Sequence, residues 1–185
     1  MIGNRVGHRF TVAAYHRMIE KGYLTPKDRV ELIRGEILVK RSVGREHAVR
    51  ARKLNRLFNR VLGDRVSVDV QNPLVLNDSE PEPDIVLLKP SDDDYELRKP
   101  EAKDAFVVIE VSFSSIDDDR DVKLPLYAEN GIPEYWIVNL EEECLEVYRS
   151  PRADGTYRKK LVLRRGDKVG IAALKGTNFE VADLI

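Results

Sequence analysis

The sequence has almost none of the residues that build metal cages and disulfide scaffolds. Cys144 is the only cysteine, which excludes an internal disulfide and a cysteine-based zinc cage. Its place in an apolar run predicts a small core side chain. The three histidines, His8, His16 and His47, lack the close pairing of a zinc motif. The sequence therefore gives no support for a zinc site.

Long apolar runs are also missing. No run approaches the roughly 18 residues that a membrane-spanning helix requires, so we expect no membrane association. The opening residues 1–9 carry charge but no apolar core, which argues against a secretory signal and favours a cytoplasmic protein. The 185 residues are enough for one domain and too few for two ordinary ones. We therefore expect a single domain over residues 1–185.

The net charge is small over the whole chain but large in one segment. The formal net charge is -1, which alone gives no reason to expect a nucleic-acid partner. Residues 41–65 differ, because they contain eight basic residues and only two acidic ones, Glu46 and Asp64. Their local net charge is +6. The basic residues are Arg41, Arg45, Arg50, Arg52, Lys53, Arg56, Arg60 and Arg65. Such a surface can neutralise phosphates.

Apolar spacing predicts that much of this basic segment is a helix over residues 46–62. Lys53, Arg56 and Arg60 share one of its faces. An ordinary solvated helix surface is the commoner meaning of such a charge run. Because acidic residues are nearly absent here, the pattern favours a helix face that binds anions.

Alternating and helical patterns along the chain predict a mixed α/β fold. The expected helices cover residues 11–21, 46–62 and about 121–130. The expected strands cover residues 30–33, 36–40, 65–70, 74–76, 85–88, 105–109, 134–138 and 144–148, with short strands after them. Two local expectations concern acids. We expect Glu80 and Glu82 to be solvated loop charges, and Ser115 with Asp118 to form a capping box ahead of the third helix. The acidic run Asp117-Asp118-Asp119 suits the N-terminus of that helix, so we expect these acids to cap it rather than to bind a metal.

Three residues between 83 and 123 carry the strongest chemical pattern. Asp84 opens the strand 85–88, Glu110 ends the strand 105–109, and Lys123 lies near the start of the following helix. Two carboxylates at the ends of adjacent strands can share one hard cation such as Mg²⁺. A lysine beside them can orient a water molecule or stabilise charge on a phosphate. Phosphodiester hydrolysis is the reaction that uses all three groups.

This order of residues resembles the PD-(D/E)XK nuclease superfamily. The usual pattern places the lysine two residues after the acid, where this chain has Ser112. The chain is more narrowly similar to the Uma-two family of putative restriction endonucleases, in which the lysine comes from the following helix. The supporting residues reach to about Val138, and they are Val30-Glu31-Leu32-Ile33-Arg34-Gly35-Glu36, His47, Gln71-Asn72-Pro73-Leu74, Pro81-Glu82-Pro83-Asp84, Ile109-Glu110-Val111-Ser112, Asp121-Val122-Lys123-Leu124 and Asn130-Gly131-Ile132-Pro133-Glu134-Tyr135-Trp136.

The resemblance implies a restriction-endonuclease-like core, which is a mixed sheet with flanking helices, followed here by added C-terminal β-strands. It implies that Asp84, Glu110 and Lys123 are catalytic and that the two acids hold Mg²⁺, for which Mn²⁺ can substitute. Strand alternation alone favours a solvent-facing Glu31, but the resemblance adds Glu31 to the catalytic and metal-binding residues. DNA is the implied partner. The expected nucleic-acid contacts are His47, Lys53, Arg56, Arg60 and Gln71.

The chain departs from the family pattern at two places. The family often has Ser-Pro-Ser after the active glutamate and an aspartate after the Tyr-Trp strand, whereas this chain has Ser112-Phe113-Ser114 and Asn139. Neither change removes a candidate ligand.

Three functions stay open on the sequence. The first is a Mg²⁺-dependent DNA endonuclease. The second is a catalytically silent nucleic-acid-binding or assembly module on the same fold. The third is a structural domain in which Lys123 and Glu110 form an ion pair. Because cutting both strands of a duplex needs two active sites or two visits, we also predict a homodimer.

Overall fold

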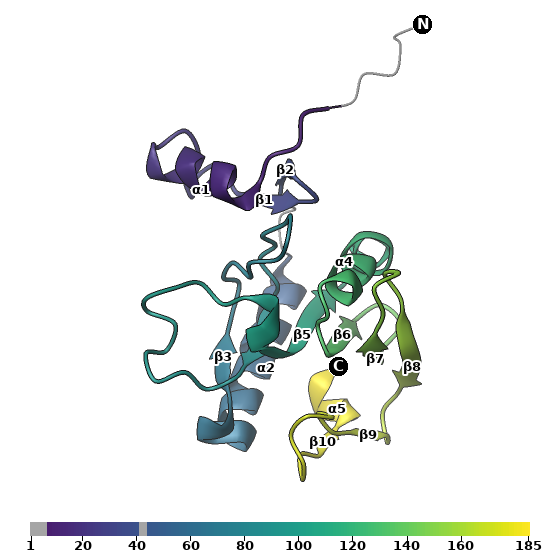
Figure 1. Ribbon diagram of the computed structural model, residues 1–185. Helices are drawn as coiled ribbons and strands as arrows, with labels where there is room; N and C mark the ends of the chain where they lie inside the picture. The colour runs from purple at the N-terminus through teal and green to yellow at the C-terminus, as the bar shows by residue number, and fades with distance from the viewer. Residues whose placement is uncertain (1–6, 41–43) are drawn as a thin grey trace, which may run out of the picture.

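A six-stranded mixed sheet organises the computed structural model, which describes residues 7–40 and 44–185 (Figure 1). Arg41 and the first part of the 1–9 segment lie outside the described residues. The strand order is β3-β4-β5-β6-β7-β8, with β5 and β6 parallel and the other neighbours antiparallel. The strands are β3 (Ser67–Asp69), β4 (Ile85–Leu88), β5 (Ala105–Ser112), β6 (Glu134–Asn139), β7 (Cys144–Pro151) and β8 (Tyr157–Leu163). The predicted mixed α/β sheet is confirmed.

Helix α2 (Arg45–Leu62) covers one face of this sheet. Leu54, Phe58 and Leu62 recur at helical spacing and are almost fully buried, because they pack on the α2-facing side chains of β4, β5 and β6. Phe58 lies 6.4 Å from Trp136 and 5.4 Å from Phe179, measured between ring centroids. The end of the chain adds β9 (Lys168–Val169), β10 (Phe179–Glu180) and α5 (Val181–Leu184) to the same face. The sequence patterns did not predict α5.

The opposite face is covered by a helical segment that follows β5. It consists of α3 (Ile116–Asp118), a π-helical turn η3 (Asp119–Lys123) and α4 (Leu124–Glu129). Leu126 and Tyr127 of α4 are fully buried there, and the Tyr127 ring lies 5.0 Å from that of Tyr135. Side chains alternate along a strand, so Glu110 faces this layer while Ile109 faces α2.

A separate hairpin of β1 (Val30–Ile33) and β2 (Glu36–Val39) confirms the predicted turn at Arg34 and Gly35. Gly35 has a φ of +76°, and a Cβ there would lie 3.0 Å from the Phe10 carbonyl oxygen. The Gly35 N–H also donates to the carbonyl of Asp78 at 2.9 Å. Helix α1 (Val12–Glu20) lies beside the hairpin at the top of Figure 1. The Thr11 hydroxyl accepts a hydrogen bond from the Ala14 N–H, as a helix cap does.

Several predicted elements differ from the structure. Residues 74–76 make an isolated bridge, Val75 to Glu101, and no strand within residues 7–40 and 44–185 pairs along them. A 3₁₀ turn, η1 (Gly63–Arg65), replaces the start of the predicted strand at 65, and another, η2 (Ala102–Asp104), precedes β5. No helix in the described part of the chain is long and apolar enough to cross a membrane.

Candidate active site

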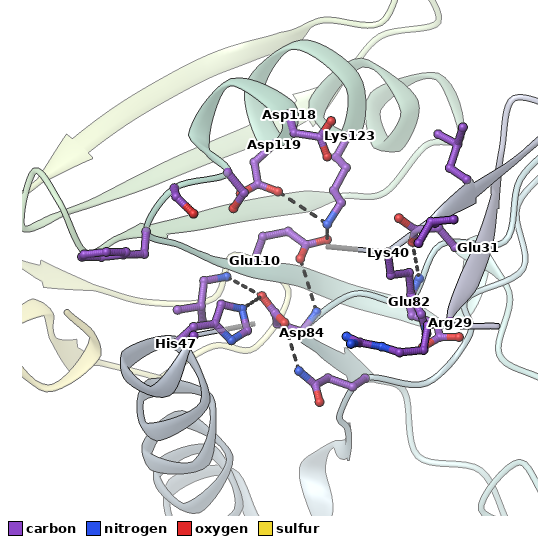
Figure 2. Close-up of a pocket in the computed structure, with 18 of the residues that line it drawn as sticks. Arg29, Glu31, Lys40, His47, Glu82, Asp84, Glu110, Asp118, Asp119 and Lys123 are labelled. Atoms are coloured by element: carbon purple, nitrogen blue, oxygen red, sulfur yellow. Dashed lines mark hydrogen bonds and ion pairs between the residues drawn. The ribbon is translucent and has the colours of Figure 1, made fainter. Parts of the chain in front are cut away.

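A pocket of about 1100 Å³ opens where the hairpin, the start of α2 and the ends of β4 and β5 meet (Figure 2). Its walls carry acidic and basic side chains from segments that are far apart in the sequence. The acids include Glu31, Glu82, Asp84, Glu110, Asp118 and Asp119, and the bases include Arg29, Lys40, Arg45, His47 and Lys123. The structure therefore brings Glu31, Asp84, Glu110 and Lys123 into one pocket.

Asp84 and Glu110 lie next to each other because β4 and β5 pair with Ile85 opposite Ile109. The Asp84 N–H donates to Glu110 Oε2 at 3.3 Å, and the side chains of both residues are buried. Asp84 Oδ2 accepts the Val111 N–H at 2.8 Å and lies 2.7 Å from His47 Nε2. Burial acts to raise the pKa of Asp84, but its hydrogen bonds to His47 and Val111 outweigh burial and lower it. Asp84 is therefore held as a carboxylate.

Glu110 and Lys123 form the centre of the pocket. Lys123 Nζ lies 3.0 Å from Glu110 Oε1, and the Tyr127 hydroxyl donates to the same oxygen at 2.9 Å. Burial raises the pKa of Glu110 well above its ordinary value, opposed by Lys123. Burial acts to lower the pKa of Lys123, but the carboxylates of Glu110, Asp119 and Glu31 outweigh it, and the pKa is raised. Lys123 is thus a fixed ammonium rather than a proton acceptor.

Asp119 is a fourth acid at this centre, and the sequence patterns assigned it to helix capping. It is 2% exposed, and its Oδ1 lies 3.5 Å from Lys123 Nζ. The predicted capping box is wrong, because the Ser115 side chain makes no cap hydrogen bond and its Oγ donates to Asp119 Oδ2 at 3.1 Å. The signal that could have identified Asp119 is its spacing of four residues from Lys123, which places the two on one helix face.

Glu31 lines the pocket from β1, so the solvent-facing orientation that alternation favoured is wrong. Its Oε2 accepts the Glu82 N–H at 3.2 Å, and burial raises the pKa of Glu31. The prediction for Glu80 is also wrong. That side chain is 2% exposed, lies 2.6 Å from Lys99 Nζ and pairs with His16. Glu80 is buried and Glu31 is half-buried because the hairpin packs against the 77–83 loop.

The predicted nucleic-acid residues separate into two groups. His47 and Gln71 join the pocket, and Gln71 Nε2 donates to Asp84 Oδ1 at 3.4 Å. His47 Nδ1 is buried and has no hydrogen-bond partner among the described residues. Lys53, Arg56 and Arg60 are exposed farther along α2 and do not line this pocket.

The donor set of the pocket suits one kind of metal. Within residues 7–40 and 44–185, no three histidine, cysteine, aspartate or glutamate side chains are grouped so that they could hold one metal ion, and a zinc site requires such a group. Mg²⁺ binds through one or two carboxylates and keeps several waters. Asp84 and Glu110 would supply those oxygens, and Glu31 and Asp119 line the same pocket with further carboxyl groups. These residues therefore fit Mg²⁺ or a similar hard cation.

Comparisons with known proteins agree with this geometry. A crystal structure described as "a putative nuclease belonging to DUF820 from Anabaena variabilis" superposes with a TM-score of 0.72 at 16% sequence identity, covering 95% of this chain and 97% of that one. At this identity the likeness shows a shared fold. No curated protein matches the chain. The model of the Uma2 family, described as "Putative restriction endonuclease", matches residues 12–182, and the chain belongs to that family.

Proposed function

We propose that this protein is a Mg²⁺-dependent endonuclease that hydrolyses phosphodiester bonds in DNA. The observation that carries the proposal is the convergence of Asp84, Glu110 and Lys123, from three separate segments, on one open pocket. A structural ion pair alone would not need an accessible pocket with more acids than it has ammonium groups. Membership of a family described as restriction endonucleases supports the same conclusion.

Asp84 and Glu110 are the proposed metal ligands, and Glu31 faces the same space. When bound there, Mg²⁺ would offset negative charge that develops on the phosphate. His47 and the Val111 N–H hold the Asp84 carboxylate in one orientation. The Tyr127 hydroxyl does the same for Glu110.

Lys123 is the proposed partner of the reacting phosphate or of the attacking water. Because its ammonium stays protonated, it donates hydrogen bonds and does not remove a proton. Asp119 and Glu110 fix its position from two sides. We propose Asp119 as a positioning residue that acts through Lys123.

Cleavage of a nucleic-acid panel tests this function. The purified protein and Asp84→Ala are incubated with duplex DNA, single-stranded DNA and RNA, with Mg²⁺, with Mn²⁺ or with chelator. We expect metal-dependent cleavage of DNA that Asp84→Ala abolishes. If neither metal supports cleavage of any substrate while both proteins bind DNA equally, the endonuclease proposal is wrong and a binding module is favoured.

The homodimer and the cytoplasmic location stay predictions. A light-scattering mass of one chain at micromolar concentration would contradict the homodimer.

A further inference from the structure

A second pocket, of about 430 Å³, lies beside the first along helix α2. The two pockets share Arg45 and Glu46 in their walls, so they adjoin each other at the start of the helix. Four basic side chains line the second pocket against two acidic ones. The basic residues are Arg45, Arg50, Lys53 and Arg165, and the acidic residues are Glu46 and Glu143.

Arg50 is the unusual member of this second pocket. Its side chain is half-buried, and among the described residues no carboxylate forms an ion pair with it. Burial and the neighbouring Arg165 both lower the pKa of Arg50, so its surroundings disfavour its positive charge. A desolvated cation without an anion is costly. Because no carboxylate of the described residues pairs with this charge, the site suits an anion that comes from outside.

Arg165 supports the same assignment from another segment. It reaches the pocket from the turn after β8, and its contact with Glu143 is long, at 3.6 Å, with both side chains more than half exposed. An exposed pair of this kind contributes little. Arg165 is therefore available to an incoming anion, and its guanidinium can bind phosphate through two parallel hydrogen bonds.

The helix extends the basic surface away from the first pocket. Lys53, Arg56 and Arg60 continue from Arg45 on one side of α2. At a rise of about 1.5 Å per residue, Arg45 and Arg60 are about 22 Å apart along the helix axis. This length matches about six base pairs of duplex DNA at about 3.4 Å each. A regularly spaced polyanion fits the surface better than one small anion.

We propose that Arg50 and Arg165, with Arg45 and Lys53, bind a backbone phosphate of duplex DNA that lies a short distance along the strand from the phosphate cleaved at Lys123. This site rests on the proposed nuclease function for the identity of its ligand. It contributes affinity and register but no base recognition, because phosphate contacts carry no sequence information.

DNA binding by a cleavage-deficient protein tests the site without interference from turnover. The dissociation constant of a fluorescent 20-base-pair duplex is measured in the Asp84→Ala background with Mg²⁺, across a series of salt concentrations. Arg50→Gln and Arg165→Gln are compared with Arg158→Gln, which removes an exposed charge from the other end of β8. Because Arg165 is exposed, Arg165→Gln keeps the test valid even if Arg50→Gln destabilises the fold.

We expect Arg50→Gln and Arg165→Gln each to weaken binding roughly tenfold at low salt and to reduce the slope of log affinity against log salt by about one. Arg158→Gln should leave both quantities unchanged. The proposal is overturned if the slopes of all three variants equal that of the parent. It is also overturned if inorganic phosphate saturates the pocket at micromolar concentration while Arg50→Gln and Arg165→Gln leave the dissociation constant of the duplex unchanged.

These results are separable from the proposed function. If the wild-type protein cleaves DNA but the salt slopes do not change, the nuclease proposal stands and the phosphate site fails. If nothing is cleaved but Arg50→Gln and Arg165→Gln still lower the slope, the phosphate site stands and the nuclease proposal fails.

Discussion

At the scale of single residues, the proposed reaction depends on how Lys123 is held among acids. Its Nζ lies 3.0 Å from Glu110 Oε1 and 3.5 Å from Asp119 Oδ1. A lysine side chain is long and flexible, so two carboxylates on different sides restrict where its charge can be. Displacement of a catalytic group by about 1 Å can slow a reaction by about a hundredfold.

Asp119→Asn therefore tests positioning. We expect a roughly tenfold slower single-turnover cleavage, because the amide attracts the ammonium less and lets it move. DNA affinity should not fall, because the change removes a negative charge beside the substrate. The matched control is Asp118→Asn, since Asp118 lines the same pocket, whereas the ion pairs of Lys123 are with Glu110 and Asp119. Equal rates for wild type and Asp119→Asn would rule out the positioning role.

The free energy of unfolding of the metal-free protein should depend on pH through the titration of Glu110. Its pKa in the folded state is raised above the ordinary value of 4.5, mainly by burial, so the folded state binds more protons than the unfolded state between these two pKa values. The free energy of unfolding therefore falls as pH rises through that window. We expect Glu110→Gln to remove the part of this decrease in the free energy of unfolding that comes from Glu110.

Urea unfolding in chelator at pH 5 and pH 8 measures the effect. The loss of stability between the two pH values should be smaller for Glu110→Gln than for wild type. A larger loss in the variant would contradict the sign of the pKa shift.

Some residues of the site were predictable and others were not. Asp84 and Glu110 stand at the ends of apolar strands, and neighbouring strand ends lie close in space. Asp119 fitted two patterns, a helix cap and a face shared with Lys123, and the π-helical turn that decides between them is not visible in the sequence. Glu80 was mispredicted because its partners, Lys99 and His16, are far away in the chain.

At the scale of elements, the segment after β5 explains the displaced lysine. Ser112, on the same strand face as Glu110, is fully buried, so the strand position that usually carries the lysine is closed here. The π-helical turn η3 lies over the face of β5 that carries Glu110 and brings Lys123 Nζ to within 3.0 Å of Glu110 Oε1. Single-turn π-helices occur frequently at functional sites.

Helix α2 presents His47 and the basic residues, so its anchoring matters for the site. Phe58 is its fully buried anchor against Trp136 and Phe179. We expect Phe58→Ala to lower the free energy of unfolding by about 3–5 kcal/mol, because it leaves a cavity. Val61→Ala, on the exposed side of the same helix, should change it by less than about 0.5 kcal/mol. Urea titration of both variants checks this, and similar losses would contradict the assigned anchor.

The strands and helices themselves were largely predictable, because alternating and helical spacing decide them locally. The β1–β2 hairpin and α2 agree with the patterns to within a residue or two. Residues 74–76 have strand composition, but a strand also needs a neighbour, which local spacing does not reveal. Helix α5 was missed because it is only four residues long, too short for a periodic pattern.

At the scale of the whole molecule, a cation in the first pocket should stabilise the fold. Mg²⁺ would offset the repulsion among Glu31, Asp84, Glu110 and Asp119, and a ligand that binds only the folded state raises its stability. We expect Mg²⁺ to raise the melting temperature at constant ionic strength and to do so much less in Asp84→Ala. Equal shifts in both proteins would place the effect outside this pocket.

The most direct test of the central claim is the rate of plasmid cleavage at saturating Mg²⁺ by wild type, Lys123→Ala and Lys89→Ala. Lys89 is an exposed lysine outside the pocket, and within the described part of the chain its ammonium donates a hydrogen bond only to the Lys103 carbonyl, so it controls for loss of charge. Removing one group that stabilises a transition state costs about 10²- to 10³-fold. We predict that loss for Lys123→Ala and none for Lys89→Ala. Wild-type cleavage that persists unchanged in Lys123→Ala would contradict the account.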